Sequence, residues 1–554
     1  MLSYNQQGIQ SRLIPSFLAL SVISALYSPL QAAWVINDSD STNRTEHINA
    51  TISSNITLNN KNTAIYTDGN GAQLGQLTIN EGVTIQVNKA NGKGIEINTG
   101  KNGTSVNNIT NNGHINTRGT GISINDRSSA ETITIGANGS ITSAGGNAIY
   151  VGNSSRVNHI DIQGATTGSG GIINRGTIGV QTTTQPNGIK VTGSIISNNR
   201  GATAITNQGT IHGGINIDNG TLTGGSQGVN GRFYVAIHNN GGTINGGIKV
   251  GEGSTLNGGI MNYASSYGAH STLNGGIEVA GTINGTNIGI QNSFGTINGD
   301  VKITGSGSMT GNIWNQTTID GKVEIKGTLT GEIRNRNNNS QSMITGGIIV
   351  SGGTITNGIK NEGTVRQNIK VENGGNLQGQ GIVNQGKVEG NVQIQSSNVT
   401  NIQNTGTITQ KIEVTQNSTI QNGITNTNKI NGIDIANSQI GGNIVNSGSN
   451  ANTGAINITG TSNVGGSIIN QNGATFNNQI TLEQGSKLGG ISNNANSTMS
   501  GQLTLNGEVG TIYNAGKFDS TLTLSNKVGE INNAEGGTIS NDITINNNGS
   551  VGAI

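Results

Sequence analysis

The stretch GGIMN, residues 258–262, carries the pattern that decides the fold. Its triplet Ile-x-Asn, where x varies, returns as IQN (290–292), IWN (313–315) and IRN (333–335), and continues to INN (531–533). From Asn262 to Asn533 twelve steps average about 22.6 residues. Internal repeats of this length are typical of solenoids, in which each repeat is one coil stacked on the next.

A second repeated motif has an apolar residue on either side of a variable one. It occurs as IKV (248–250), IEV (277–279) and VKI (301–303), and continues to ITI (543–545) with the same spacing. Alternation with a period of two indicates β-strands, and the Gly and Asn residues between motifs suit tight turns. A third motif with a single apolar residue, as in GTING (242–246), lies between the other two. The chain is therefore predicted to be all-β, a right-handed parallel β-helix with three short strands and about 22 residues per coil.

The same geometry explains why one Ile and one Asn recur together. Alternate residues of a strand share a face, so both should point into the coil, and each should stack on its equivalent about 4.8 Å away. A column of asparagines can join its side-chain amides into a ladder and satisfy corner backbone groups. The expected structural ladder consists of Asn262, Asn292, Asn315, Asn335, Asn361, Asn384, Asn404, Asn426, Asn446, Asn470, Asn493, Asn514 and Asn533.

The composition excludes several other classes of protein. Among 554 residues there are 91 Gly, 3 Pro and no Cys, with 10% charged and 3% aromatic residues. An ordinary globular core needs more aromatic residues, and a disordered chain would carry fewer β-branched ones. The formal net charge of +1 offers no field for nucleic acid, so no nucleic-acid partner is expected.

The first 32 residues are predicted to be a signal peptide. The apolar segment LIPSFLALSVISALY (13–27) follows Arg12, and small residues at Ala32 and Ala33 suit cleavage between them. An uncleaved membrane anchor is the alternative, although the apolar segment is short for a membrane span. A long exported chain without cysteine indicates bacterial export, with the protein at the outer membrane, on the cell surface or outside the cell.

Two regions follow the signal peptide. Residues 33–240 are expected to form irregular coils with longer loops, because their motifs are spaced by about 27 to 40 residues. Residues 241–554 are expected to form regular coils. Ile554 stands at the Ile position of a further triplet, in the middle of a coil, so we expect the natural protein to be longer.

No catalytic residue, metal ligand or cofactor site is predicted. Glu413 and Asp434 should lie on neighbouring coils, about 5 Å apart, as in some glycosidases or Ca²⁺ sites. Neither Gln393 nor Asn457, the adjacent outward residues, adds the groups that such a site needs, so solvated carboxylates are the preferred interpretation. The six histidines are scattered without metal-ligand spacing.

The best candidates for binding are the large side chains concentrated on two inserted loops. Arg and Tyr are favoured anchors of binding surfaces. Packing of Phe233 or Tyr234 back onto the rod is the competing interpretation. The candidate loop residues are Arg232, Phe233, Tyr234, Tyr263, Tyr267 and His270.

The predicted signal peptide, the absence of cysteine and coils such as GTINGGIKV (242–250) together resemble the passenger region of bacterial autotransporters. The resemblance covers residues 34–554 and implies transport through a C-terminal outer-membrane barrel, which this chain lacks. It also implies a non-enzymatic adhesin or rod-like stalk whose partner is a host-cell surface, a matrix or a glycan. A polysaccharide-acting β-helix enzyme and a two-partner secreted exoprotein are the alternatives.

Overall fold

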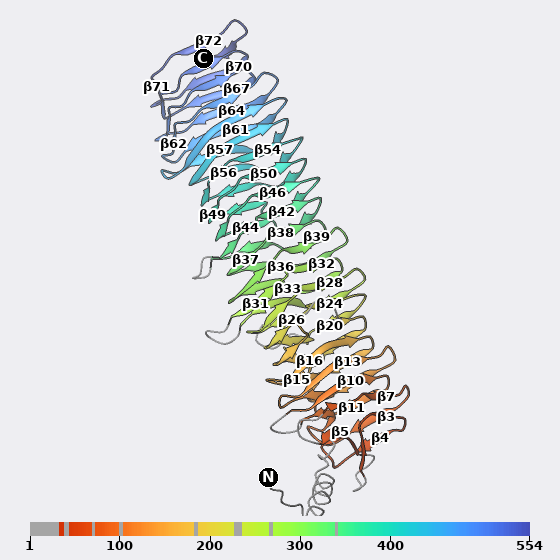
Figure 1. Ribbon diagram of the computed structural model, residues 1–554. Helices are drawn as coiled ribbons and strands as arrows, with labels where there is room; N and C mark the ends of the chain where they lie inside the picture. Colours follow the sequence, from red (N-terminus) through yellow and green to blue (C-terminus); the bar gives the residue numbers. More distant parts are fainter. Residues whose placement is uncertain are drawn as a thin grey trace, which may run out of the picture.

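The computed structural model describes residues 33–37, 44–68, 73–98, 103–181, 187–225, 235–264, 270–337 and 342–554. Over these residues the chain is a parallel β-solenoid of about 20 coils, and the predicted fold class is confirmed (Figure 1). Successive coils are about 24 residues apart, slightly more than predicted. The described residues include no helix, and hence none that could span a membrane.

One regular coil shows how the short strands are arranged. It comprises β27 (Thr243–Asn245), β28 (Ile248–Val250), β29 (Thr255–Asn257) and β30 (Gly259–Tyr263). These four define the first, second, third and fourth strand positions of a coil. The first and second positions belong to a 32-stranded sheet, and the third and fourth belong to a 37-stranded sheet. Near the C-terminal end the first position forms a separate four-stranded sheet.

The expectation of three strands per coil needs a correction. Most coils have four strand positions. The third apolar motif of the sequence repeat, such as TIN or TLN, occurs at two of these positions in each of these coils. TIN (243–245) is at the first position and TLN (255–257) at the third, so the two look alike in sequence. In some coils two positions join, as in β33 (Thr282–Ser293), which pairs with both β29 and β30, and three strands then remain.

The core is a set of aliphatic columns that run along the rod. Ile244, Ile248, Val250, Leu256 and Ile260 supply one coil and are all buried. Each stacks on its equivalent in the next coil; Ile248, for example, is in register with Ile277. Because every coil buries its apolar residues partly against its neighbours, the coils depend on one another for stability.

At the N-terminal end the chain departs from parallel coiling. Strand β1 (Ala33–Asn37) pairs antiparallel with β2 (Arg44–His47) and with β5 (Thr63–Asp68). The side chain of Trp34 is fully buried there. No repeated motif in the sequence predicts this strand. It starts immediately after the predicted cleavage site, and the predicted signal peptide itself lies outside the described residues.

Candidate binding face beside the asparagine ladder

The asparagines of the Ile-x-Asn triplets form a continuous chain of side-chain hydrogen bonds. Asn262 is fully buried, and its Nδ2 donates to Oδ1 of Asn292 at 2.8 Å and to the carbonyl oxygen of Thr296 at 3.1 Å. Asn292 donates in turn to Asn315 at 2.9 Å. Since an amide nitrogen has two hydrogens, one continues the ladder and the other satisfies a backbone carbonyl at the corner.

The ladder is longer than the sequence analysis predicted. It begins at Asn174, whose Nδ2 donates to Asn207 at 2.7 Å, and it includes Asn239. In the preceding coil the equivalent inward position holds Val151, which cannot take part. At the other end Asn514 donates to Asn533 at 2.7 Å. All thirteen predicted asparagines belong to this chain of amides, which has one interruption.

The residue between Ile and Asn points away from the core, because neighbouring residues of a strand alternate in direction. Twenty outward residues are in unbroken register along the fourth strand position: sixteen from Ile-x-Asn triplets and four from the equivalent position of the coils before Asn174. We call this column the ladder face. Its members are Tyr66, Glu96, Ser123, Tyr150, Ile173, Thr206, His238, Met261, Gln291, Trp314, Arg334, Lys360, Val383, Gln403, Thr425, Val445, Ile469, Ser492, Tyr513 and Asn532.

Aromatic residues outside the core are concentrated on this face. Among the described residues, Trp34, Phe476 and Phe518 are buried. The remaining described aromatic side chains are half-buried or exposed, and every one lies on the ladder face or beside it: Tyr66, Tyr150, Tyr263, Phe294, Trp314 and Tyr513. By contrast, the outward column of the second strand position is mostly polar, as at Lys249, Glu278 and Lys302.

Three ring-bearing side chains form an aromatic cluster at the middle of the rod: His238, Tyr263 and Phe294. The rings of His238 and Tyr263 are stacked with centroids 6.1 Å apart, and Phe294 meets Tyr263 edge-on at 5.7 Å. Phe294 is 57% exposed and has a φ of 51°. A left-handed backbone is costly for a bulky residue, and strain of this kind is often found at functional sites.

His238 is held as a neutral donor. Its Nε2 lies 3.1 Å from the carbonyl oxygen of Tyr263, which can only accept, so this nitrogen carries the proton. Burial lowers the pKa of His238 from its ordinary value of 6.5, although the hydrogen bond to Tyr263 opposes this shift. The ring is therefore uncharged at neutral pH.

Only part of the predicted loop set can be placed. Arg232, Phe233, Tyr234 and Tyr267 lie outside the described residues. Tyr263 is in the aromatic cluster, and His270 is exposed just before β31 (Ser271–Asn274). The sequence analysis missed His238, Phe294 and Trp314. For His238 and Trp314 a signal was available, because each is the middle residue of an Ile-x-Asn triplet.

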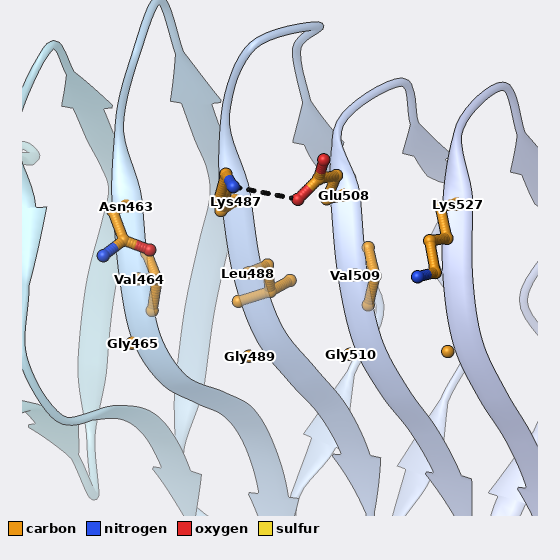
Figure 2. Close-up of a pocket in the computed structure, with 11 residues that line it drawn as sticks. Asn463, Val464, Gly465, Lys487, Leu488, Gly489, Glu508, Val509, Gly510 and Lys527 are labelled. Carbon is orange, nitrogen blue, oxygen red and sulfur yellow. Dashed lines mark ion pairs between the residues drawn. The ribbon is translucent and has the colours of Figure 1, made fainter.

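A shallow groove runs along the rod near its C-terminal end (Figure 2). Its floor has one glycine per coil: Gly465, Gly489, Gly510 and Gly529. A Cβ atom on Gly510 would lie 2.1 Å from the carbonyl oxygen of Gly489, so close backbone packing excludes a side chain and leaves a trough. Tyr513 of the ladder face is on the same strand as Gly510, β67 (Glu508–Asn514).

Charged residues border this groove on one side. Lys487 and Glu508 form an ion pair of 3.1 Å across neighbouring coils, and Lys527 follows in register (Figure 2). The groove therefore combines bare backbone with a mixed-charge edge, and it crosses successive strands.

The two candidate carboxylates are neighbours in register, but other groups hold each of them. Gln393 Nε2 donates to Glu413 at 2.7 Å. Asp434 accepts from Lys411 Nζ at 2.8 Å and from Asn457 Nδ2 at 2.7 Å. These contacts account for both side chains as parts of the polar outer surface. Within the described ranges, no three His, Cys, Asp or Glu residues are grouped so as to hold a metal ion.

Comparison with known proteins does not add to this geometry. No protein-family model, no characterised protein and no solved structure matches the chain.

Proposed function

We propose that the chain is a non-enzymatic, exported binding rod: an autotransporter passenger region that acts as an adhesin or display stalk at the bacterial surface. The observation that carries this proposal is the concentration of non-core aromatic residues on the ladder face. Large rings are scarce in this sequence, and exposing them to water is unfavourable. Their collection on one face of a polar rod supports a role in contacting a partner.

The shape of the molecule supports binding at many points. A solenoid repeats nearly the same outward column every 4.7–4.9 Å, so a partner can meet several weak sites at once. Linked weak contacts give an overall affinity well above that of each contact. A rod of this kind also holds its far coils away from the point of attachment.

The expected partner is a host-cell surface, a matrix or a glycan rather than nucleic acid. Two cations of the ladder face are paired with one carboxylate: Glu362 contacts Arg334 at 2.6 Å and Lys360 at 2.8 Å. Burial tends to raise the pKa of Glu362, but hydrogen bonds from these two cations hold it below its usual value. These cations are already paired, which disfavours binding to phosphate backbones.

Export is supported by the sequence alone. The apolar segment and small residues of the predicted signal peptide, and a chain without cysteine, suit passage to the surface of a bacterium. Treating intact producing cells with a protease should degrade the protein without lysis. Protection of the chain until the cells are broken would contradict the proposed location.

Binding is tested with the purified full chain. We expect saturable retention on host-cell layers or on immobilised matrix components, and competition by excess unlabelled protein. Saturable retention would establish that the rod is adhesive, but it would not identify the chemical group that the rod contacts. If correctly folded protein is retained on neither type of surface, the adhesin proposal fails.

A further inference from the structure

We infer that the ladder face binds a linear, uncharged glycan that lies parallel to the rod axis. This inference rests on the proposed binding function and adds the chemical class and direction of the ligand. Three observations carry it: the spacing of the rings, the axial groove and the ion pairs beside the face.

Four of the five ring-bearing residues of the ladder face are evenly spaced, three coils apart. Tyr66, Tyr150, His238 and Trp314 are each three register steps apart, and Tyr513 lies nine steps beyond Trp314. At the strand spacing, three steps correspond to about 14 Å along the axis. Contacts at a fixed axial interval suit a polymer with a regular repeat better than a globular partner.

An extended glycan has a suitable repeat. One sugar unit is about as long as one strand spacing, so every third sugar of an axial chain would reach a ring. The less polar C–H face of a sugar can pack on an aromatic ring, as other apolar groups do. Tyr150 is already covered on one face by Arg175, whose guanidinium carbon is 5.9 Å from the ring centroid. Trp314 and Tyr513 are therefore the better residues to test.

The groove supports the same direction independently. Its glycine floor continues from coil to coil through Gly489, Gly510 and Gly529, so it too runs along the axis. Gly510 lies three residues before Tyr513 on β67, so the groove runs parallel to the column that holds Tyr513. The groove and the column of rings thus favour one extended ligand.

The outward groups between the rings are suited to sugar hydroxyls. The ladder face has amides at Gln403 and Asn532 and hydroxyls at Thr206, Thr425 and Ser492. Thr206, Ser492 and Asn532 each make one local hydrogen bond and keep further hydrogen-bonding capacity. A lipid surface or a sulfated chain would instead favour clusters of free cations. Here Glu362 pairs with Arg334 and Lys360, and Glu508 pairs with Lys487, so these cations are not free, which favours an uncharged ligand.

Binding is measured on the immobilised full chain with linear β-1,4-linked glucose and N-acetylglucosamine oligomers, from dimer to octamer. Heparin fragments serve as charged probes. We expect an uncharged series to bind, with affinity rising steeply at about four units, the length that spans two rings. Trp314→Ala should weaken binding about three- to tenfold, because it removes one ring of the His238–Trp314 pair. Tyr513 lies nine steps from Trp314, farther than an octamer reaches, so Tyr513→Ala should leave that affinity unchanged and remove only binding at its own coil. Trp314→Phe, which keeps a ring, should lose less.

The control is Ile349→Ala, because Ile349 is a half-buried outward residue of the second strand position, in the other sheet. It should leave binding unchanged. No binding of either uncharged series, binding of heparin alone, or an affinity of Trp314→Ala equal to that of the unchanged protein would overturn the glycan assignment. Retention on cells or matrix is scored separately. If it persists while the oligomers fail to bind, the proposed adhesin function stands and this inference does not.

Discussion

Asn426 and Asn446, neighbours in the asparagine ladder, are joined through the hydroxyl of Thr453. Asn426 Nδ2 donates to Thr453 Oγ1 at 2.9 Å, and that hydroxyl donates to Asn446 Oδ1 at 2.9 Å. Thr453 occupies the inward position that Ile430 fills in the preceding coil. A polar residue is buried here because it completes the ladder.

Thr453→Val should therefore destabilise the coils around it. Valine fills the same space, but the buried Oδ1 of Asn446 loses this donor, at a cost of about 1–3 kcal/mol. Thr453→Ser keeps the hydroxyl and should lose less stability. Amide hydrogen exchange in these coils measures the local free energy of opening. Equal protection in the valine variant and the unchanged protein would show that the bridge contributes nothing.

Asn384→Asp should destabilise the rod strongly at neutral pH. Asn384 donates to Asn404 at 2.7 Å, and a buried carboxylate would place two acceptors together. We expect a loss on the order of 3 kcal/mol or more. Burial raises the folded pKa of such an Asp above its unfolded value, so stability should recover as the pH falls below that folded pKa. Urea unfolding at neutral and acid pH checks this. Gln403→Glu, on the exposed side of the same coil as Asn404, should have little effect; similar losses in both variants would contradict a buried ladder.

Gly510→Ala should lower stability by about 1–3 kcal/mol, because the new methyl group meets the carbonyl oxygen of Gly489 at 2.1 Å. Gly305→Ala is the matched control, since a Cβ atom there has nothing within 4 Å. The control should change the free energy of unfolding by less than about 1 kcal/mol. Thermal unfolding of both variants is the measurement. A larger loss in Gly510→Ala shows that close backbone packing requires glycine on the groove floor, and equal small losses would contradict this.

Acid should weaken the aromatic cluster. The folded pKa of His238 is lowered by burial, so the unfolded chain binds more protons as the pH falls through 6.5. Stability contributed by neutral His238 is then present above about pH 6.5 and is lost on acidification. NMR titration of the imidazole checks the direction, and His238→Gln should reduce the local acid sensitivity. A measured pKa at or above 6.5 would contradict the buried, neutral ring.

Much of the fold could be predicted because each coil repeats the same inward residues. The spacing of Ile260 and Asn262 gave the register of the fourth strand position correctly, with Asn262 opposite Asn292. The first and third strand positions were combined because each contributes one apolar residue beside Thr. Strand β1 was missed because it occurs once and pairs antiparallel, so no repeat reveals it.

The candidate site was harder to predict, because the variable residue of the triplet differs from coil to coil and gives no repeating pattern. His238 and Trp314 occupy that variable position, and a comparison along the column would have found them. Phe294 gave no such signal. It lies outside the triplet, and its left-handed backbone, which makes it unusual, is a property of the folded chain.

The central claim is that Ile and Asn of each triplet build the rod while the middle residue binds. The most direct test compares retention of two full-length variants on the surface that binds the unchanged protein. One combines Tyr150→Ser, Trp314→Ser and Tyr513→Ser on the ladder face; the other combines Ile349→Ser, Thr504→Ser and Thr523→Ser on the other sheet. We predict that the first loses retention with little change in thermal unfolding and the second keeps it. Equal retention by both folded variants would contradict the claim.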